Sequence, residues 1–409
     1  MKCRHCGSEV TLPVINLGSA PPSNAYLTQI SMRRSEKWFP LKVVICESCW
    51  LVQAEAYSRA AELFNEEYAY FSSFSTQWLK HADEYVQTMI ERFGLTTASR
   101  VIEVASNDGY LLQYVKQHGM PCLGVEPTAS TAAASRLKGI ETIEEFFGVA
   151  LATDLAAKGW QADLMTANNV LAHVPDINDF AAGFSILLKP TGVATFEFPH
   201  LMNLIEGNQF DTIYHEHFSY LSLTAVQRIF AANGLAVFDV EEHPTHGGSL
   251  RVFAQRAETG THVQTDRLAE LLNREEASGM RTAAYYSGFQ AKAEKVKNDF
   301  LAFLIDAKRQ NKKVAAYGAA AKGNTLMNYA GIRSDLISFV VDRNPAKQGK
   351  FMPGSRIPIV DETHLHEFKP DYVVILPWNL KNEIMQQLDY VRSWNGEFVT
   401  AIPTLETLP

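Results

Sequence analysis

The chain has 409 residues, of which 46% are hydrophobic and 20% are charged. This length exceeds one ordinary hydrophobic core, so two or three domains are expected. The net charge of -8 argues against a nucleic-acid-binding surface, and no apolar run reaches the length of a membrane span. Because the N-terminus also lacks the apolar region of a signal peptide, we expect a cytoplasmic protein without nucleic-acid or membrane partners, acting as a monomer.

Four of the five cysteines form two Cys-x-x-Cys pairs, Cys3 with Cys6 and Cys46 with Cys49. Four thiolates are the tetrahedral ligand set that Zn²⁺ favours, and such a closed site leaves no open position for catalysis. The pattern predicts one structural Zn²⁺ in a domain over residues 1–60. Two redox-active pairs are the alternative, but the βαβ pattern that surrounds such motifs is missing.

Strands and helices alternate along the rest of the chain. After two short strands at 12–18 and 41–45 and a helical stretch over 62–89, strands are expected at 100–105, 121–126, 163–167, 192–199, 235–240 and 249–254, with helices at 109–117, 128–137, 177–188 and 223–233. This alternation predicts an open, mostly parallel α/β sheet in a domain over 61–260. A charged helical stretch over 261–310 precedes further strands at 313–317, 336–341, 371–376 and 397–402 and helices at 324–329 and 380–389, which predict a second α/β domain over 261–409.

A degenerate glycine loop follows the first strand of the central domain, Glu103-Val104-Ala105-Ser106-Asn107-Asp108-Gly109. Its spacing is that of the acidic-x-Gly-x-Gly-x-Gly loop of methyltransferases, with Ala105 and Asn107 where glycines usually stand. Small residues in a tight strand-to-helix turn let the backbone pass close to a bound nucleoside. An incidental turn and an NAD-binding domain are the alternatives, but the Gly-x-Gly-x-x-Gly of NAD-binding folds is absent.

Further side chains follow the next strands in the order expected around S-adenosylmethionine (SAM). Glu126 ends the second strand, where a carboxylate meets the ribose diol in dinucleotide folds. Phe146 and Phe147 are candidates for contact with adenine, and Asn168 and Asn169 follow the fourth strand. The expected SAM-binding residues are Tyr68, Tyr70, Ser72, Glu103, Asn107, Asp108, Gly109, Glu126, Pro127, Phe147, Asn168 and Asn169.

A phenol, two imidazoles and a carboxylate stand together in Tyr214-His215-Glu216-His217. All of these groups move or stabilise protons near neutral pH. The likeness to the zinc-protease motif His-Glu-x-x-His is false, because that motif places its histidines four residues apart on one helix face. We interpret the cluster as acid–base machinery.

Together these motifs resemble the sugar C-methyltransferases that act on nucleotide-linked 4-keto-deoxysugars. The likeness covers almost the whole chain and implies a zinc-binding N-terminal domain, a class I (Rossmann-like) methyltransferase domain that binds SAM, and a Rossmann-like C-terminal domain. Two departures are Ala105, where glycine is usual, and His215, where a compared member carries an acidic residue; the family pattern tolerates other residues at His215, so the resemblance implies no catalytic role for it. Besides the two cysteine pairs, the matching motifs are Leu17-Gly18-x-x-Pro21, Tyr68-x-Tyr70-x-Ser72-Ser73, Asn107-Asp108-Gly109, Asn168-x-x-x-x-His173-Val174-Pro175, Phe210-Asp211-x-Ile213-Tyr214-x-Glu216-His217, His246-Gly247-Gly248 and Tyr317-Gly318-Ala319-x-Ala321-Lys322.

The resemblance implies methyl transfer from SAM to C-3 of a nucleotide-linked, dTDP-bearing 4-keto-deoxysugar, with S-adenosylhomocysteine as the second product. The 4-keto group acidifies the C-3 proton and accepts the charge as an enolate, so the reaction needs a base and donors to the enolate. By carry-over from the family, His217 is the base, Tyr214 and His173 stabilise the enolate, and Glu216 relays a proton or orients His217. Taken alone, His173 and Glu216 also fit purely structural roles.

The C-terminal domain is expected to hold the nucleotide end of the substrate, because the loop from Tyr317 to Thr325 brings backbone amides and a lysine to a helix N-terminus. The expected substrate-binding residues are His246, Gly247, Arg251, Gly318, Lys322, Asn324, Asp342 and Lys347. Two rival functions are a zinc-ribbon RNA methyltransferase, which the acidic balance disfavours, and a non-catalytic zinc-dependent interaction protein, which leaves the residues 214–217 unexplained.

Overall fold

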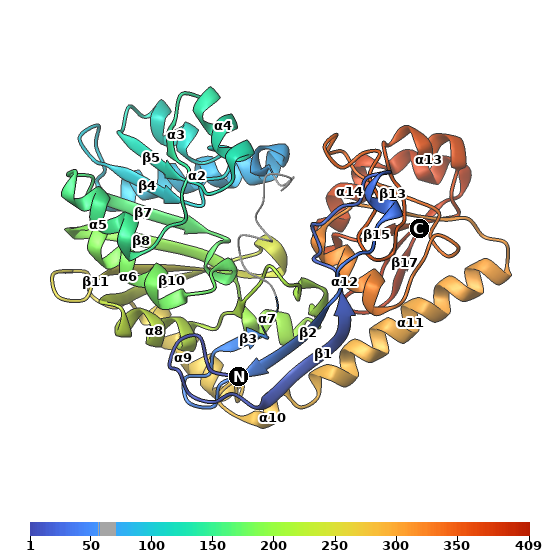
Figure 1. The fold of residues 1–409 in the computed structure, drawn as a ribbon, viewed down its shortest axis with the longest axis horizontal. Coiled ribbons are helices and arrows are strands. Elements are labelled where there is room, and N and C mark those ends of the chain that lie inside the picture. Colours follow the sequence, from blue (N-terminus) through green and yellow to red (C-terminus); the bar gives the residue numbers. More distant parts are fainter. Residues whose placement is uncertain (56, 58–70) are drawn as a thin grey trace.

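The computed structural model describes residues 1–55, 57 and 71–409. Three β-sheets with flanking helices make up this part of the chain, which confirms the expected α/β class. The N-terminal sheet lies below and between the two larger α/β domains in Figure 1. Tyr68 and Tyr70 fall outside the described residues. Within the described ranges, no helix combines the length and apolarity needed to cross a membrane.

The N-terminal sheet is antiparallel and has the strand order β1-β2-β3-β9. The sequence predicted its first two strands, and both extend beyond the predicted ranges. Its fourth strand comes from the middle of the chain, about 165 residues after the third in the sequence. The strands are β1 (Leu12–Ala20), β2 (Phe39–Ile45), β3 (Val52–Ala54) and β9 (Ser219–Tyr220).

The central domain is a seven-stranded sheet with the order β10-β11-β8-β7-β4-β5-β6. Only β11 opposes its neighbours, so β10 and the other strands share one direction. The strands are β4 (Val101–Val104), β5 (Cys122–Val125), β6 (Glu141–Ile143), β7 (Ala162–Asn168), β8 (Leu188–Pro199), β10 (Leu235–His243) and β11 (Ser249–Arg256). The helices are α2 (Thr76–Phe93), α3 (Leu112–Gln117), α4 (Ala129–Leu137), α5 (Val149–Ala157), α6 (Ile177–Leu187), α7 (Leu201–Glu206) and α8 (Leu223–Ala232).

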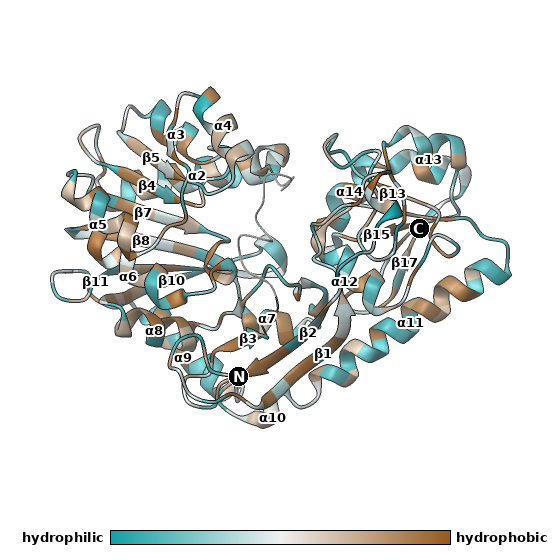
Figure 2. Cartoon of the chain, viewed as in Figure 1, coloured by the Kyte–Doolittle hydropathy of each residue, from teal (hydrophilic) through white to brown (hydrophobic). Residues whose placement is uncertain are grey.

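Three helices connect the central domain to the C-terminal domain: α9 (Asp266–Ala277), α10 (Ala283–Tyr286) and α11 (Phe289–Arg309). Hydrophobic and hydrophilic residues alternate along α11, which runs beneath the C-terminal domain (Figure 2). Its buried side chains recur every three or four residues, at Phe289, Ala293, Val296, Phe300, Leu304 and Ala307. This spacing places one helix face against the core, as expected for an amphipathic helix.

The C-terminal domain is a second, mostly parallel sheet with the order β14-β13-β12-β15-β16-β17. Only the edge strand β17 runs antiparallel to its neighbour. The strands are β12 (Val314–Tyr317), β13 (Val340–Val341), β14 (Ile359–Val360), β15 (Tyr372–Ile375), β16 (Glu397–Thr400) and β17 (Glu406–Leu408). The α-helices are α12 (Ala321–Tyr329), α13 (Thr363–Phe368) and α14 (Lys381–Gln387).

One hydrophobic core joins the N-terminal sheet, the segment before β9, α11 and the C-terminal sheet. Phe210 and Ile213, which precede the Tyr214–His217 cluster, are buried in it. A loop of the N-terminal domain also reaches the C-terminal domain, where Leu27 and Phe351 form a backbone bridge. The cluster is therefore held where all three parts of the chain meet.

Candidate active site

The imidazole of His217 is held in one tautomer by the segment that precedes it. Its Nδ1 lies 2.9 Å from the carbonyl oxygen of Thr212, so Nδ1–H donates and Nε2 keeps its lone pair. The hydroxyl of Tyr214 lies 2.8 Å from that Nε2 and donates to it. The 3₁₀ turn Phe210–Thr212 places the carbonyl of Thr212, a residue that the sequence did not single out.

His217 is neutral in this environment. Burial lowers its pKa well below the usual value, and the neighbouring His173, His246 and Lys322 add to the effect. The rings of His173 and His217 have centroids 4.5 Å apart. Nδ1–H of His173 donates to the carbonyl oxygen of Glu216 at 2.8 Å, and burial lowers the pKa of His173 to about 4. Two neutral imidazoles therefore pack edge-on, and the lone pair of one, Nε2 of His217, accepts from the hydroxyl of Tyr214.

The N-terminal domain contacts both residues between Tyr214 and His217. One carboxylate oxygen of Glu216 accepts hydrogen bonds from the backbone N–H and the side-chain amide of Asn24, at 3.1 and 3.2 Å. Nε2 of His215 lies 3.3 and 3.2 Å from the carbonyl oxygens of Phe39 and Pro40 and donates to them. The orienting partner of His217 is therefore the carbonyl of Thr212, and Glu216 binds the loop that carries Asn24.

The degenerate glycine loop adopts the backbone of a glycine loop. Ala105 and Asn107 have φ angles of 57° and 49°, and Gly109 has 73°. Glu126 closes the loop, because its two carboxylate oxygens accept from the backbone N–H groups of Asn107 and Thr128, each at 2.9 Å. The two residues that stand in for glycine thus take the left-handed conformation that glycine adopts most easily.

The remaining SAM candidates fall into two groups. The first group lies at the carboxyl ends of β4 and β7. Glu103 is fully buried there, and Asn168 donates to the hydroxyl of Tyr110 at 3.4 Å. The backbone N–H of Ser72 donates to Oδ1 of Asn107 at 2.9 Å. Asp108 forms an ion pair with Lys138, and Pro127 is half-buried beside Glu126. Phe147 instead packs edge-on against Phe180 and Phe184 in the core, while its neighbour Phe146 is 55% exposed.

The carboxyl end of β7 also touches the loop between β10 and β11. The side-chain amide of Asn169 donates to Nε2 of His246 at 3.2 Å, and the ring of Trp78 packs edge-on against His246 with centroids 5.3 Å apart. His246 takes a left-handed φ of 55°. Gly247 packs so closely on Trp378 that a Cβ at this position would lie 2.5 Å from the indole ring. These contacts place the His246 loop, which was expected to bind the substrate, beside the carboxyl end of β7; its role in substrate binding stays a prediction.

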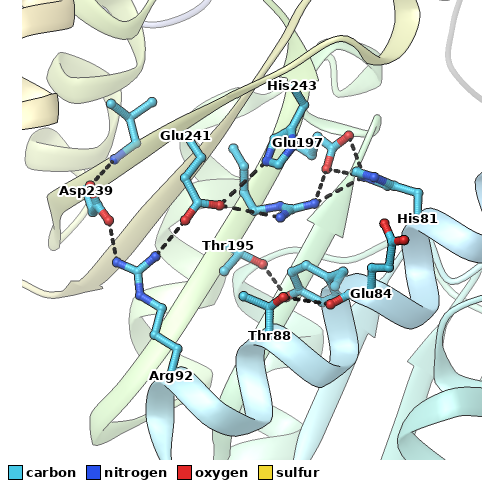
Figure 3. A network of polar contacts seen from close by, with 12 residues as sticks. His81, Glu84, Thr88, Arg92, Thr195, Glu197, Asp239, Glu241 and His243 are labelled. Carbon is cyan, nitrogen blue, oxygen red and sulfur yellow. Dashed lines mark hydrogen bonds and ion pairs between the residues drawn. The ribbon is translucent and has the colours of Figure 1, made fainter.

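Arg251 is only 4% exposed and forms ion pairs with Glu197 and Glu241, whose side chains are labelled in the network of Figure 3. Its guanidinium lies 2.8 Å from Glu197 and 3.5 Å from Glu241, and Glu197 also bonds His81 at 2.9 Å. Burial alone would raise the pKa of Glu197, but the hydrogen bond from His81 and the charge of Arg251 lower it to about 2. The geometry favours a structural role for Arg251 over contact with a substrate.

Lys322 is a cation of the C-terminal domain whose charge contributes to lowering the pKa of His217. Its ammonium donates to Oδ1 of Asn379 at 2.6 Å and lies 4.7 Å from the ring centre of Trp378. Trp378 in turn donates to the buried carboxylate of Asp211 at 2.9 Å. The sequence named Asp211 only as part of a family motif and did not single out Trp378, because only the fold brings the two residues together.

Other candidates on the C-terminal domain hold its loops together. The ammonium of Lys347 donates to the carbonyl oxygen of Ala319 at 2.8 Å, and the carboxylate of Asp342 accepts from the backbone N–H of Ala319 at 2.8 Å. Gly318 has a φ of 89°, which permits this turn. Asn324 donates to the carbonyl oxygen of Ser23 at 2.6 Å and so binds the N-terminal domain.

The four cysteines come together as a metal-binding set. Their sulfur atoms all lie within 4.8 Å of one another, and the Cys3–Cys49 and Cys6–Cys46 pairs are 3.5 Å apart. Four thiolates around Zn²⁺ at about 2.3 Å give sulfur–sulfur separations of about 3.8 Å. The residues present therefore fit a closed tetrahedral zinc site, with Cys3, Cys6, Cys46 and Cys49 as its ligands.

Three family models match successive parts of the chain: "Putative zinc binding domain" at residues 3–64, "Methyltransferase domain" at 78–240 and "C-methyltransferase C-terminal domain" at 244–403. The chain is 35% identical over 402 residues to the C-methyltransferase NovU of Streptomyces niveus, covering 98% of this chain and 95% of NovU. The chain belongs to the C-methyltransferase family. It is also 25% identical over 138 residues to a ubiquinone biosynthesis O-methyltransferase of Bordetella avium, covering 31% of this chain and 57% of that protein.

Solved structures similar to the chain include methyltransferases. Magnesium protoporphyrin IX methyltransferase from Synechocystis PCC 6803 with bound SAM is 14% identical, covers 44% of this chain and 79% of its own, and has a TM-score of 0.34. The PH0226 protein from Pyrococcus horikoshii is 13% identical, covers 49% of this chain and 100% of its own, and has a TM-score of 0.39. From the family models and NovU, this C-methyltransferase is a SAM-dependent enzyme with a zinc-binding N-terminal domain.

Proposed function

We propose that this C-methyltransferase methylates C-3 of a dTDP-linked 4-keto-deoxysugar and that His217 is the base. The observation that carries the proposal is the fixed tautomer of a buried, neutral His217, whose Nδ1–H donates to Thr212 and whose Nε2 accepts from Tyr214. A base needs a lone pair that can reach the proton it removes, and the lone pair of Nε2 becomes available when the hydroxyl of Tyr214 turns from it to the 4-keto oxygen of the sugar. The carbonyl of Thr212 aims that lone pair without adding a charge.

In the proposed reaction, Nε2 of His217 takes the proton from C-3, and the electrons of the C–H bond pass to the 4-keto oxygen to form an enolate. The hydroxyl of Tyr214, already beside Nε2, shifts its hydrogen bond to the enolate oxygen, and His173 stabilises the same charge. Carbon C-3 then attacks the methyl group, and S-adenosylhomocysteine leaves. SAM supplies the electrophilic methyl group. Glu216 keeps the segment in place through Asn24.

The proposed SAM site is the glycine-like loop after β4. Its left-handed residues, the carboxylate of Glu126 and the amide of Asn168 lie at the carboxyl ends of adjacent parallel strands, where ligands of open α/β sheets bind. Among the described residues, Oδ1 of Asp108 is buried without a hydrogen-bond partner, which fits a polar ligand at this loop. Residues 68 and 70 stay predictions, because they lie outside the described ranges.

We propose that the C-terminal domain holds the nucleotide end and that Lys322 meets the pyrophosphate. Lys322 lies near enough to lower the pKa of both His217 and His246, so the domain brings its cation to the reaction centre. All three domains of one chain contribute to the proposed site, through Asn24, His217 and Lys322, which supports a site that is complete within a monomer. We also propose that the enzyme acts in the cytoplasm and binds no nucleic acid.

The proposal is tested by incubating the enzyme with isotopically methyl-labelled SAM and a panel of dTDP- and UDP-linked 4-keto-deoxysugars, their 4-hydroxy counterparts and a total RNA preparation. We expect label on a carbon next to the keto group of a dTDP sugar, located by NMR, and none with 4-hydroxy sugars. Label on oxygen or on RNA would refute it.

Replacing Tyr214 by phenylalanine is expected to lower kcat by about 10²-fold, the usual cost of one lost donor to a developing oxyanion. The KM for SAM should change little, since Tyr214 bonds His217 and not the glycine-like loop. Steady-state kinetics of methyl transfer measures both. Equal kcat values for the two proteins would remove Tyr214 from the mechanism.

The pH dependence of the reaction should lack the usual histidine titration. Burial lowers the pKa of His217 well below the usual value, so the neutral, basic form persists as the pH falls through 6.5. We therefore expect kcat to be constant from about pH 8 down to about pH 6 and to fall only at more acid pH. A tenfold loss of kcat between pH 7.5 and 6 would contradict a buried, neutral base.

A further inference from the structure

The zinc centre and the catalytic segment meet in one small sheet. Strand β9 begins two residues after His217 and, within the part of the chain that the structure describes, β3 is the strand with which it pairs, so that Val52 and Gln53 lie opposite Tyr220 and Ser219. The backbone N–H of Ala54 extends this pairing with a 3.0 Å hydrogen bond to the carbonyl oxygen of Phe218. Whatever positions β3 therefore positions the residues directly after the proposed base.

Gln53 is the residue of β3 that also touches the metal ligands. Its side chain is fully buried, its amide nitrogen lies 3.3 Å from the sulfur of Cys3, and its amide oxygen accepts from the backbone N–H of Arg4 at 3.0 Å. Arg4 stands between the ligands Cys3 and Cys6. A second contact runs in parallel, because the guanidinium of Arg4 donates to the carbonyl oxygen of Ala54 at 2.9 Å and lies 5.0 Å from the ring centre of Phe218.

A buried amide that donates to a ligand sulfur gains from a thiolate, which is a stronger acceptor than a thiol. Zn²⁺ binding deprotonates its cysteine ligands, so it strengthens the bond from Gln53 to Cys3 and fixes the side chain. Because the backbone of Gln53 pairs with that of Ser219, a fixed Gln53 also holds Ser219 in place.

We propose that Gln53 is a positioning residue that transmits the order of the zinc centre to the catalytic strand β9. The inference rests on the proposed role of His217, which lies two residues before this strand. Zinc in this enzyme then acts on the reaction from outside the substrate site, by holding the segment that carries the base.

Ser8 offers a matched control. Its hydroxyl oxygen lies 3.4 Å from the sulfur of Cys6, so it also contacts a metal ligand, but Ser8 is not part of β3. The test compares the zinc-loaded full-length wild type with Gln53→Met, which keeps the side-chain volume without a donor, and with Ser8→Ala. Zinc-release rates, hydrogen exchange of peptides covering 216–221, kcat and the KM for SAM are measured for each.

Loss of an outer contact to a metal ligand is expected to raise zinc release by about tenfold or more in both variants. In zinc-saturated enzyme, only Gln53→Met should speed exchange at 216–221, by about tenfold, and lower kcat to a similar extent, with the KM for SAM and exchange at 101–104 unchanged. Unchanged exchange at 216–221 in Gln53→Met, an equal effect of Ser8→Ala, or faster exchange throughout the central sheet would each overturn the proposal. Hydrogen exchange measures the link between the zinc centre and β9 without requiring catalysis. It therefore distinguishes a failure of this inference from an error in the role of His217.

Discussion

Replacing His217 by glutamine is expected to lower the rate of methyl transfer by about a thousandfold. Glutamine keeps most of the volume and can still donate to the carbonyl oxygen of Thr212, but it has no basic lone pair to take a proton from carbon. General-base catalysis contributes about 10²–10⁴-fold to enzymatic rates. Single-turnover methyl transfer from labelled SAM measures the loss, and binding of SAM by calorimetry should stay unchanged.

His215→Gln is the matched control for this variant. His215 is two residues away and equally buried, but it donates to the carbonyl oxygens of Phe39 and Pro40 in the N-terminal domain. We expect its kcat to stay within about threefold of the wild type, with some loss of thermal stability from the weakened contact. If His215→Gln lost as much activity as His217→Gln, the cluster would act through packing and not through one base.

Replacing Arg251 by methionine is expected to destabilise the enzyme by about 3–5 kcal/mol, the cost of leaving a buried charge without its partner. The carboxylate of Glu197 is fully buried, and after the change it keeps only His81 and the hydroxyl of Thr245 as polar partners. The network in Figure 3 would then be cut between α2 and β11. Urea unfolding of the variant measures the loss.

Arg267→Met is the control in the same network. Its side chain is 52% exposed, and the carboxylate it bonds, Asp239, keeps Arg92 as a second partner. An exposed ion pair contributes about 0–1 kcal/mol, so we expect a loss in that range. A loss of less than about 1 kcal/mol in Arg251→Met would show that the buried pair is not what holds these strands and α2 together.

The effect of Arg251→Met should also depend on pH in a defined direction. The pKa of Glu197 is lowered to about 2 in the folded enzyme, against about 4.3 for an unperturbed glutamate. A carboxylate with a lowered pKa stabilises the fold above its unfolded pKa and loses that contribution as the pH falls toward its folded pKa. The difference in stability between wild type and variant should therefore shrink from pH 5 toward pH 2.

The sequence predicted the features that depend on residues close together in the chain. The cysteine spacing predicted the four-sulfur set, and the alternation of strands and helices predicted most of both larger sheets. Strands of two or three residues, such as β9, β14 and β17, were missed because so short a run carries no period. The strand expected at 336–341 is only Val340–Val341, because the chain is still turning before it: the backbone N–H groups of Leu336 and Ile337 both bond to the carbonyl oxygen of Arg333.

The sequence alone could not predict contacts between segments that are far apart in the chain. No local pattern reveals that Thr212 orients His217, that Asn24 binds Glu216, or that Gln53 joins a metal ligand to the catalytic strand. The prediction for Arg251 illustrates the same limit, since a guanidinium suits a phosphate and a buried carboxylate equally well. Only the fold places Glu197 beside it.

The N-terminal domain emerges as a support for the catalytic segment. It binds His215 and Glu216 by hydrogen bonds and pairs with β9. The proposed base, His217, lies in the loop between the 3₁₀ turn Phe210–Thr212 and β9. A loop residue needs such support, because catalysis requires the reacting groups to be held to within a fraction of an ångström.

The central claim, that His217 removes a proton from carbon before the methyl group moves, is tested most directly by solvent exchange in the absence of SAM. A dTDP-linked 4-keto-deoxysugar deuterated at C-3 is incubated with the enzyme in ordinary water and followed by NMR. We predict rapid loss of deuterium with the wild type and with His215→Gln, and none above background with His217→Gln. Undiminished loss of deuterium with His217→Gln would show that another group is the base.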